Sequence, residues 1–247
     1  MSADKTMIAE RPAAERAKRR AGRRPAPSPD KATSATLVYE KLRQDILKGV
    51  VAPGGKLAID AVAAMYDAGT NPVREALNRL SSERLVDRQD QRGFFVPEIS
   101  LERWRELVKT RCWLESTALT ESMRHRDTVW EENIVLAFHR LSKCSLVNDE
   151  DARSAWEVQH RAFHMALLTN CGSRWLMDFC EILMDHAQRY IMISAVSANR
   201  SAIEEHREIM NAVLDGDIER AVGVLVAHYQ RTLSYIEGQI PALAPTS

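Results

Sequence analysis

Apolar residues recur every three or four positions over most of the chain, which is the spacing of an amphipathic helix. From Ser100 onward this spacing predicts helices near residues 100–124, 127–147, 150–170, 173–196, 199–214 and 216–239. Glycine is scarce in this half, and short breaks such as Cys171-Gly172-Ser173 separate the helices. Because short connections place successive helices antiparallel to one another, we expect an antiparallel all-helical bundle in residues 98–240.

The segment at residues 35–97 contains shorter elements. One helix is expected to end before Gly49, and a second, short helix follows it. A third begins at Asn71-Pro72, since asparagine is a good N-cap and proline fits the first helical position. The apolar positions of this third helix follow the spacing i, i+3, i+4, i+7, at Val73, Ala76, Leu77 and Leu80.

A polar stretch and then an aromatic run follow the third helix. The run Gly93-Phe94-Phe95-Val96-Pro97 predicts the second strand of a small β-hairpin that ends at its proline. Three helices followed by a hairpin make a winged helix-turn-helix. The predicted fold class is therefore mainly α, with an N-terminal winged helix-turn-helix at 35–97 and a C-terminal antiparallel helical bundle.

The net charge of the 247-residue chain is zero, but the charges are unevenly distributed. Residues 1–35 hold nine Lys/Arg and four Asp/Glu, whereas residues 98–247 hold sixteen and twenty-two. This asymmetry favours binding of a polyanion by the front half. The alternative is that it reflects only a basic tail. Residues 1–34 lack apolar periodicity, so we expect a disordered basic tail there and a second tail at 241–247.

The composition also excludes some classes of protein. The apolar runs fall far short of the roughly 20 residues of a membrane helix. The N-terminus lacks the apolar segment of a secretory signal, so we expect a cytoplasmic protein without a membrane partner. No CxxC pair is present, which favours reduced thiols over a cysteine zinc site; the cysteines are Cys112, Cys144, Cys171 and Cys180.

The polar face of the third helix carries the residue types of a DNA reader. Arg74 and Asn78 lie four positions apart, opposite the apolar face. Arginine is the commonest bidentate partner of guanine, and asparagine pairs similarly with adenine. The alternative is a surface helix with an ordinary charged face.

Four of the seven histidines are spaced as a metal site requires. His160 and His164 are i, i+4 on one helix and therefore share a face. His206 and His228 flank the turn at Gly216 and would lie at similar heights in a helical hairpin. Two such pairs facing each other would hold a transition metal such as Zn, Ni, Cu or Fe. The alternative is a set of scattered polar or capping histidines.

The front half resembles the N-terminal domain of GntR-family bacterial transcription regulators. The resemblance is carried by Asn71-Pro72-Val73-Arg74-Glu75-Ala76-Leu77, Leu80, Leu85-Val86 and Gly93-Phe94-Phe95-Val96, and upstream by Ile46-Leu47-Lys48-Gly49, Pro53-Gly54 and Leu57. It implies that the turn before the third helix, the first residues of that helix and the wing tip contact an operator. The implied contacts are Thr70, Asn71, Arg74, Gln91, Arg92 and Gly93, with Arg43 on phosphate. The usual serine of the turn is replaced by Gly69, and the basic residue after it by Thr70, so base preference is expected to differ.

The helical half resembles the FCD domain of the FadR subfamily, through Arg111, Glu115, Phe163-His164, Glu205-His206 and the helix that contains Ala221…His228. Many FCD domains bind a metal through one Asp and three His. The matching positions are His160, His164, His206 and His228, with His160 at the usual Asp position. The resemblance implies one divalent transition metal, Zn, Ni or similar. The alternative is that the metal is lost and His160 serves the effector.

The same resemblance implies a small carboxylate effector beside the metal. Arg111 matches the arginine that would grip the carboxylate, although an intrahelical pair with Glu115 is the alternative. Arg189 is a second candidate.

These features together predict a homodimeric transcription regulator, a repressor, that is not an enzyme. Its expected partners are a double-stranded operator and a small organic acid, with residues 98–240 binding the effector and forming the dimer. Two alternatives are a regulator with a metal-free sensor for an acyl or lipid-like ligand, and a helical-bundle metalloenzyme that uses the four histidines.

Overall fold

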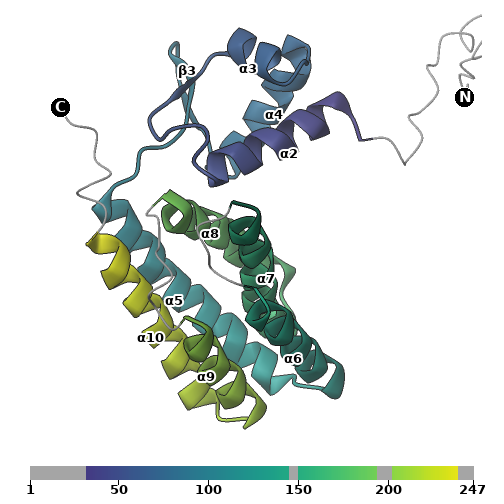
Figure 1. The fold of residues 1–247 in the computed structure, drawn as a ribbon, viewed down its shortest axis with the longest axis vertical. Coiled ribbons are helices and arrows are strands. Elements are labelled where there is room, and N and C mark those ends of the chain that lie inside the picture. The colour runs from purple at the N-terminus through teal and green to yellow at the C-terminus, as the bar shows by residue number, and fades with distance from the viewer. Residues whose placement is uncertain (1–31, 145–149, 194–201, 239–247) are drawn as a thin grey trace, which may run out of the picture. The chain divides into compact units, whose positions relative to one another are not determined.

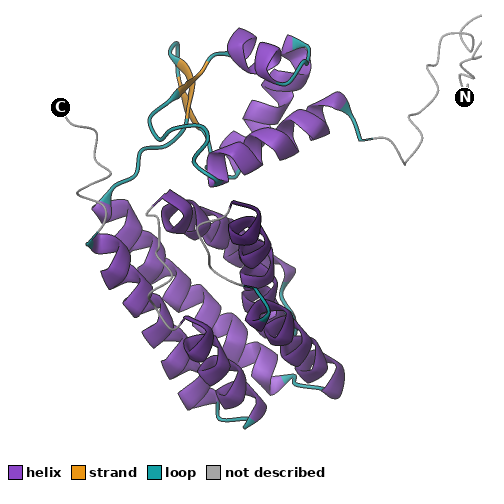
Figure 2. Ribbon diagram, in the orientation of Figure 1, coloured by secondary structure: helices purple, strands orange, loops and turns teal. Residues whose placement is uncertain are grey.

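The computed structural model describes residues 32–144, 150–193 and 202–238. The expected break at Asn148-Asp149, the tail at 241–247 and most of the tail at 1–34 lie outside these residues. Within them, helices dominate, and the strands are confined to the segment that precedes Leu101 (Figure 2).

The N-terminal segment contains the three predicted helices and a small sheet. Its elements are α2 (Ser34–Leu47), β1 (Lys56–Leu57), α3 (Ile59–Met65), α4 (Thr70–Ser82), β2 (Asp87–Gln89) and β3 (Gly93–Phe95). The three strands are antiparallel in the order β1-β3-β2, with Leu57 and Arg88 both opposite Phe94. The sequence predicted the hairpin of β2 and β3 but not the third strand, β1.

Helix α4 begins earlier than expected. Its N-cap is Gly69, in an extended conformation, rather than Asn71. Pro72 therefore lies at the third helical position instead of the first. Proline is tolerated there because the N–H groups of the first helical turn have no intrahelical acceptor.

The hydrophobic core of this segment forms where the periodicity places it. Val73, Leu77 and Leu80 of α4 are fully buried, and Ala76 is almost so. They pack in one cluster with residues of α2, α3 and the sheet, among them Val38, Leu42, Ile46, Val62 and Phe94. The amphipathic pattern of α4 thus turns its apolar face inward and leaves the opposite face to solvent.

The C-terminal half is the predicted antiparallel bundle. Its helices are α5 (Leu101–Arg124), α6 (Thr128–Ser142), α7 (Glu150–Leu168), α8 (Arg174–Ile193), α9 (Ala202–Leu214) and α10 (Ile218–Glu237) (Figure 1). Side-chain caps mark four starts among the described residues: Ser100, Asp127, Ser173 and Asp217 each accept a hydrogen bond from the backbone N–H three residues on. Such caps satisfy N–H groups that the helix itself leaves unpaired.

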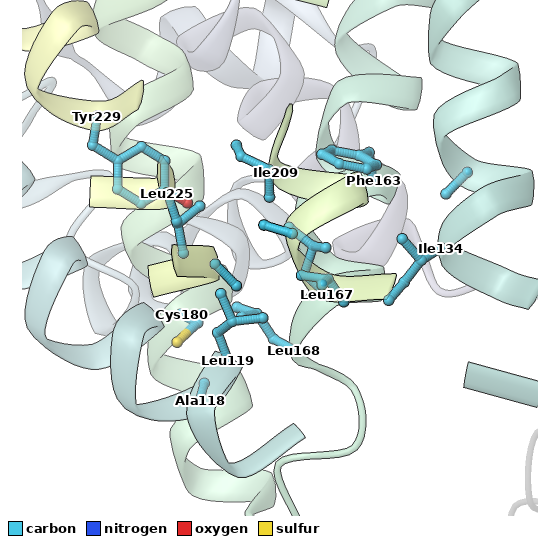
Figure 3. Packing of buried hydrophobic residues seen from close by; sticks show 14 of the residues in the cluster. Ala118, Leu119, Ile134, Phe163, Leu167, Leu168, Cys180, Ile209, Leu225 and Tyr229 are labelled. Carbon is cyan, nitrogen blue, oxygen red and sulfur yellow. The ribbon is translucent and has the colours of Figure 1, made fainter. Parts of the chain in front are cut away.

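The described residues of the bundle form one large apolar cluster. Phe163 and Leu167 of α7, Ile209 of α9 and Leu225 of α10 meet Leu119 of α5 in the interior (Figure 3). Trp104 and Trp130 are buried in the same cluster, and the indole N–H of each donates to a backbone carbonyl. None of the helices in the described ranges combines the length and apolar character of a membrane-spanning segment.

The buried face of α4 gives a direct test of this core. Leu77→Ala should lower the free energy of unfolding by about 2–5 kcal/mol, because the side chain is fully buried and its loss leaves a cavity. Leu37→Ala is the matched control, since Leu37 is 48% exposed on α2 and should cost little. Equal losses for the two variants in denaturant titrations would contradict the packing described here.

Candidate functional site

The structure brings the four predicted histidines together inside the bundle. His160 and His164 project from α7, His206 from α9 and His228 from α10. All four are buried, and one ring nitrogen of each lies within 4.8 Å of those of the others. Residues separated by up to 68 positions in the sequence therefore converge on one point.

A hydrogen-bonded relay fixes the orientation of the His164 ring. The hydroxyl of Tyr229 donates to Glu115 Oε2, so its oxygen is left to accept from His164 Nδ1, 3.2 Å away. Burial, and then Glu115, raise the pKa of Tyr229 well above its ordinary value, which keeps the proton on that hydroxyl. His164 therefore carries its proton on Nδ1 and presents the lone pair of Nε2.

Two further histidines are oriented in the same way. Nδ1 of His206 faces the carbonyl oxygen of Ala202, and Nδ1 of His228 lies 2.8 Å from Glu205 Oε2. Both partners are acceptors, so in the neutral rings Nδ1 carries the proton and Nε2 the lone pair. Acceptors on the ring nitrogen that faces away from the metal orient metal-bound histidines in proteins.

The two Nε2 atoms of His164 and His206 lie only 3.2 Å apart. Two acceptors at this distance hold together when a proton or a metal cation lies between them. A proton is disfavoured, because burial, and then the three neighbouring imidazoles and Arg111, lower the pKa of His164 well below 6.5. Neutral, converging imidazoles are the donor set that Zn, Ni, Cu or Fe prefers.

The spacing of the donors also suits a metal. Two nitrogens on one tetrahedral zinc, each at roughly 2.0–2.1 Å, lie about 3.3–3.4 Å apart. The ligand atoms of the four histidines lie within 4.8 Å of one another, so the widest pair must close by at most roughly 1.5 Å, which is within reach of side-chain rotation. These residues therefore fit a divalent transition metal, with His160 as a neutral ligand at the position where the FCD pattern has Asp.

Arg111 forms the intrahelical pair with Glu115 and also lines a cavity. Its Nε donates to Glu115 Oε1 at 2.6 Å, so the intrahelical pair exists. Burial opposes the charge, but the carboxylate of Glu115 outweighs it and raises the pKa of Arg111. The guanidinium also lies 4.3 Å from the Tyr229 ring and lines a cavity next to the histidines.

The cavity adjoins three of the four histidines and has a volume of about 60 Å³. Its lining includes His160, His206, His228, Arg111, Arg153, Trp104, Val108, Trp156, Ile191, Met192, Tyr229, Thr232 and Tyr235. Arg153 is a functional candidate that sequence reasoning missed. A signal was present, since Arg153, Trp156, His160 and His164 are spaced by three or four residues and share one face of α7.

Arg189, the second predicted effector ligand, lies elsewhere. Its guanidinium donates to the carbonyl oxygen of Pro97, and burial lowers the pKa of Arg189 to about 10. It is not among the residues that line the cavity.

The candidate DNA-contacting residues lie at the surface of the winged helix. Thr70, Asn71, Arg74 and Asn78 of α4 are exposed, as are Gln91, Arg92 and Gly93 at the tip of the β2–β3 hairpin. Arg74, Asn78, Gln91 and Gly93 line one surface hollow, together with the basic residues Lys56 and Arg88. Gly93 has a φ of +98°, which glycine adopts without strain.

Arg43, the candidate phosphate contact, is half-buried and already engaged. Its guanidinium contacts the carboxylate of Asp185 on α8, and Nε lies 4.0 Å from Glu83. In this arrangement Arg43 has acidic partners within the protein itself.

Comparison with known proteins follows the same division of the chain. Residues 35–96 match the family model for bacterial regulatory proteins of the gntR family, and residues 106–231 match the FCD domain. The chain is 35% identical over 206 residues to the uncharacterized HTH-type transcriptional regulator BphR of Paraburkholderia xenovorans, covering 80% of this chain and 83% of BphR. This chain belongs to the GntR family of transcription regulators and carries an FCD domain.

Other relatives of this GntR-family regulator agree with that assignment. The HTH-type transcriptional repressor GlaR of Escherichia coli is 29% identical over 81% of this chain and 94% of GlaR. The structure of E. coli McbR/YncC superposes with a TM-score of 0.71 at 20% identity, over 85% of this chain and all of that one. A GntR regulator from Rhodococcus sp. RHA1 gives 0.68 at 22% identity, over 84% and 99%. BphR and GlaR are both named as transcriptional regulators, which decides against the metalloenzyme alternative.

Removal of one histidine should release a metal from this GntR-family regulator. His164→Ala should lower bound zinc or nickel from one equivalent per chain to near zero, because the removed ring carries a converging Nε2. His139→Ala is the matched control, since His139 is exposed on α6. Elemental analysis after dialysis measures both, and equal metal content in the two variants would place the metal elsewhere.

Metal affinity should depend on the hydrogen-bonded relay behind His164, which can be altered without substituting any of the four histidines. Tyr229→Phe removes the acceptor of His164 Nδ1 and should weaken metal affinity about 10–100-fold. Tyr66→Phe, which loses a hydrogen bond to Asp45 in the winged helix, should leave it unchanged. Competition with a chelator of known affinity measures the metal affinity of both variants. An unchanged metal affinity in Tyr229→Phe would show that the relay does not orient His164.

Proposed function

We propose that this GntR-family regulator is a homodimeric repressor whose operator affinity is set by a small carboxylate bound in the histidine-lined pocket. The observation that carries the proposal is the convergence of buried imidazole nitrogens beside a cavity that Arg111 and Arg153 also line. A carboxylate is attracted both to a metal cation and to guanidinium groups, so the pocket favours an acid over a neutral metabolite.

The DNA-binding part of the proposal rests on the exposed face of α4. Arg74 and Asn78 lie one helical turn apart and border the same surface hollow as the wing tip. An arginine on this turn reaches the O6 and N7 atoms of guanine, and an asparagine reaches N6 and N7 of adenine. Lys56 and Arg88 add positive charge for phosphate beside them.

The sensing part rests on residues of four helices. When bound, the metal supplies a positive charge that attracts a carboxylate oxygen. Arg111 on α5 adds a guanidinium next to the imidazoles, while Glu115 and Tyr229 hold the arginine and His164 in place. Ligand binding thereby acts on α5, α7, α9 and α10 together.

An acid at this site changes operator affinity only if it binds the DNA-competent and the incompetent state unequally. Couplings of this kind are typically about 1–3 kcal/mol, which is a change of roughly 5–150-fold in affinity. A dimer with two-fold symmetry doubles the base contacts of one winged helix and calls for a palindromic operator.

Base recognition by α4 can be tested on an operator that the purified protein has selected from random DNA. Arg74→Ala should weaken binding by about 1–3 kcal/mol per half-site, because a bidentate base contact is lost. Arg140→Ala, which removes an exposed arginine of α6, is the control for general charge effects. Equal affinity of the Arg74→Ala protein and the unaltered protein for the selected site would remove Arg74 from the interface.

The link between the two sites has its own test. Titration of the zinc-loaded protein with simple carboxylates such as acetate, lactate and benzoate should change its affinity for the same operator. His164→Ala should abolish that change in operator affinity, because the variant loses the metal that attracts the carboxylate. Specific DNA binding should persist. A full response in a metal-free His164→Ala protein would show that sensing does not pass through this site.

A further inference from the structure

Most of the cavity beside the histidines is walled by apolar side chains. Six of its lining residues have aromatic rings or aliphatic chains: Trp104, Val108, Trp156, Ile191, Met192 and Tyr235. Such walls add nothing to the binding of a very small polar acid. They favour a ligand that places apolar surface against them, because burial of that surface is favourable.

The aromatic walls of the cavity continue into the histidine cluster. The indole of Trp156 stacks on the His160 ring, with centroids 4.4 Å apart and planes within 14°. The Trp104 ring is held in a second stack, 4.9 Å from Tyr190. A ligand whose carboxylate reaches the imidazoles therefore has its body against fixed, flat rings. Aromatic rings gain more from such contacts than aliphatic groups of equal area.

The size of the cavity limits the length of the ligand. Its volume of about 60 Å³ corresponds to a few water-sized spheres at roughly 10–15 Å³ each. A small ring enters this space when the lining side chains move outward. A long acyl chain would need a much larger movement, which argues against the lipid-like ligand.

Arg153 marks the end of the cavity away from the metal ligands. It precedes His160 by two helical turns on α7, which is about 10 Å along the helix axis. One of its five N–H donors goes to the carbonyl oxygen of Met192, at 3.1 Å, and this bond fixes the guanidinium at the cavity wall. A guanidinium there recognises an oxygen substituent at the far end of a ring.

We propose that the effector is a small aromatic carboxylic acid, with its carboxylate at the imidazoles and Arg111, its ring between Trp156 and Trp104, and an oxygen substituent at Arg153. This inference rests on the proposed function, because it names the class of acid that the same pocket takes. It adds Arg153 as a residue that determines specificity for the ring substituent.

The test is calorimetry of the full-length, zinc-loaded protein with four probes: acetate, benzoate, 4-hydroxybenzoate and octanoate. Benzoate should bind about 30–100-fold more tightly than acetate, since its ring buries apolar surface. 4-Hydroxybenzoate should bind more tightly still, and octanoate more weakly than benzoate. Acetate binding as tightly as benzoate, or octanoate binding more tightly, would overturn the inference.

Two variants locate the ring and its substituent. Ile191→Trp should fill the cavity and weaken benzoate at least about 10-fold, with acetate binding and zinc content unchanged. Arg153→Met should weaken 4-hydroxybenzoate about 10-fold and benzoate little, because only one charge-assisted hydrogen bond is lost. The control Arg140→Met should alter neither. Equal losses for both acids in Arg153→Met would contradict the role given to Arg153.

The outcomes separate this inference from the function on which it rests. If none of the four acids binds or alters operator affinity while zinc is bound, the pocket is not a carboxylate sensor and both proposals fail. If acetate binds and alters operator affinity as benzoate does, the sensor stands and the aromatic ligand class is wrong.

Discussion

The arrangement of the bundle interior depends on imidazole lone pairs that face one another within the buried histidine cluster. His164 and His206 present Nε2 to each other at 3.2 Å, and His228 is oriented to do the same. Each of these rings is held by an acceptor behind it, so rotation away from the centre would break a buried hydrogen bond. Such an arrangement is stabilised by a cation at the centre and weakened without one.

This constraint explains why charged groups occupy the bundle interior. Glu115 is fully buried, and the hydroxyl of Tyr229 donates to it. Arg111 neutralises that carboxylate, which would otherwise be a costly unpaired charge. The arginine at the cavity wall is thus held by the same network that orients a metal ligand. A ligand that disturbs Arg111 acts on His164 through three hydrogen bonds, by way of Glu115 and Tyr229.

Much of the fold follows from local patterns in the sequence. The buried face of α4 and the pairing of His160 with His164 need only helical periodicity, and the breaks at Gly172 and Gly216 separate the helices as expected. Strand β1 was not predicted from the sequence, because two residues are too few to show a periodic pattern. It forms only by pairing with β3, some 37 residues away. The start of α4 was misplaced because proline is acceptable at several first-turn positions.

The candidate site was predictable in its ligands and not in its surroundings. Histidine spacing and the family resemblance name the four imidazoles, but Tyr229 and Glu205 become their partners only through the packing of α10 against α5 and α9. Arg153 was missed although it shares a helical face with His160, because a lone arginine on an amphipathic helix is usually solvated. The residues that line a cavity are determined by the packing of several helices, which the spacing within one helix does not reveal.

Anomalous diffraction from crystals of the protein grown with zinc tests the central claim most directly. The account predicts one peak per chain, about 2.0–2.1 Å from Nε2 of His164, His206 and His228, with His160 completing the set. Zinc bound through Nδ1 of these rings, or a crystal with zinc at other residues and none among the four histidines, would contradict it.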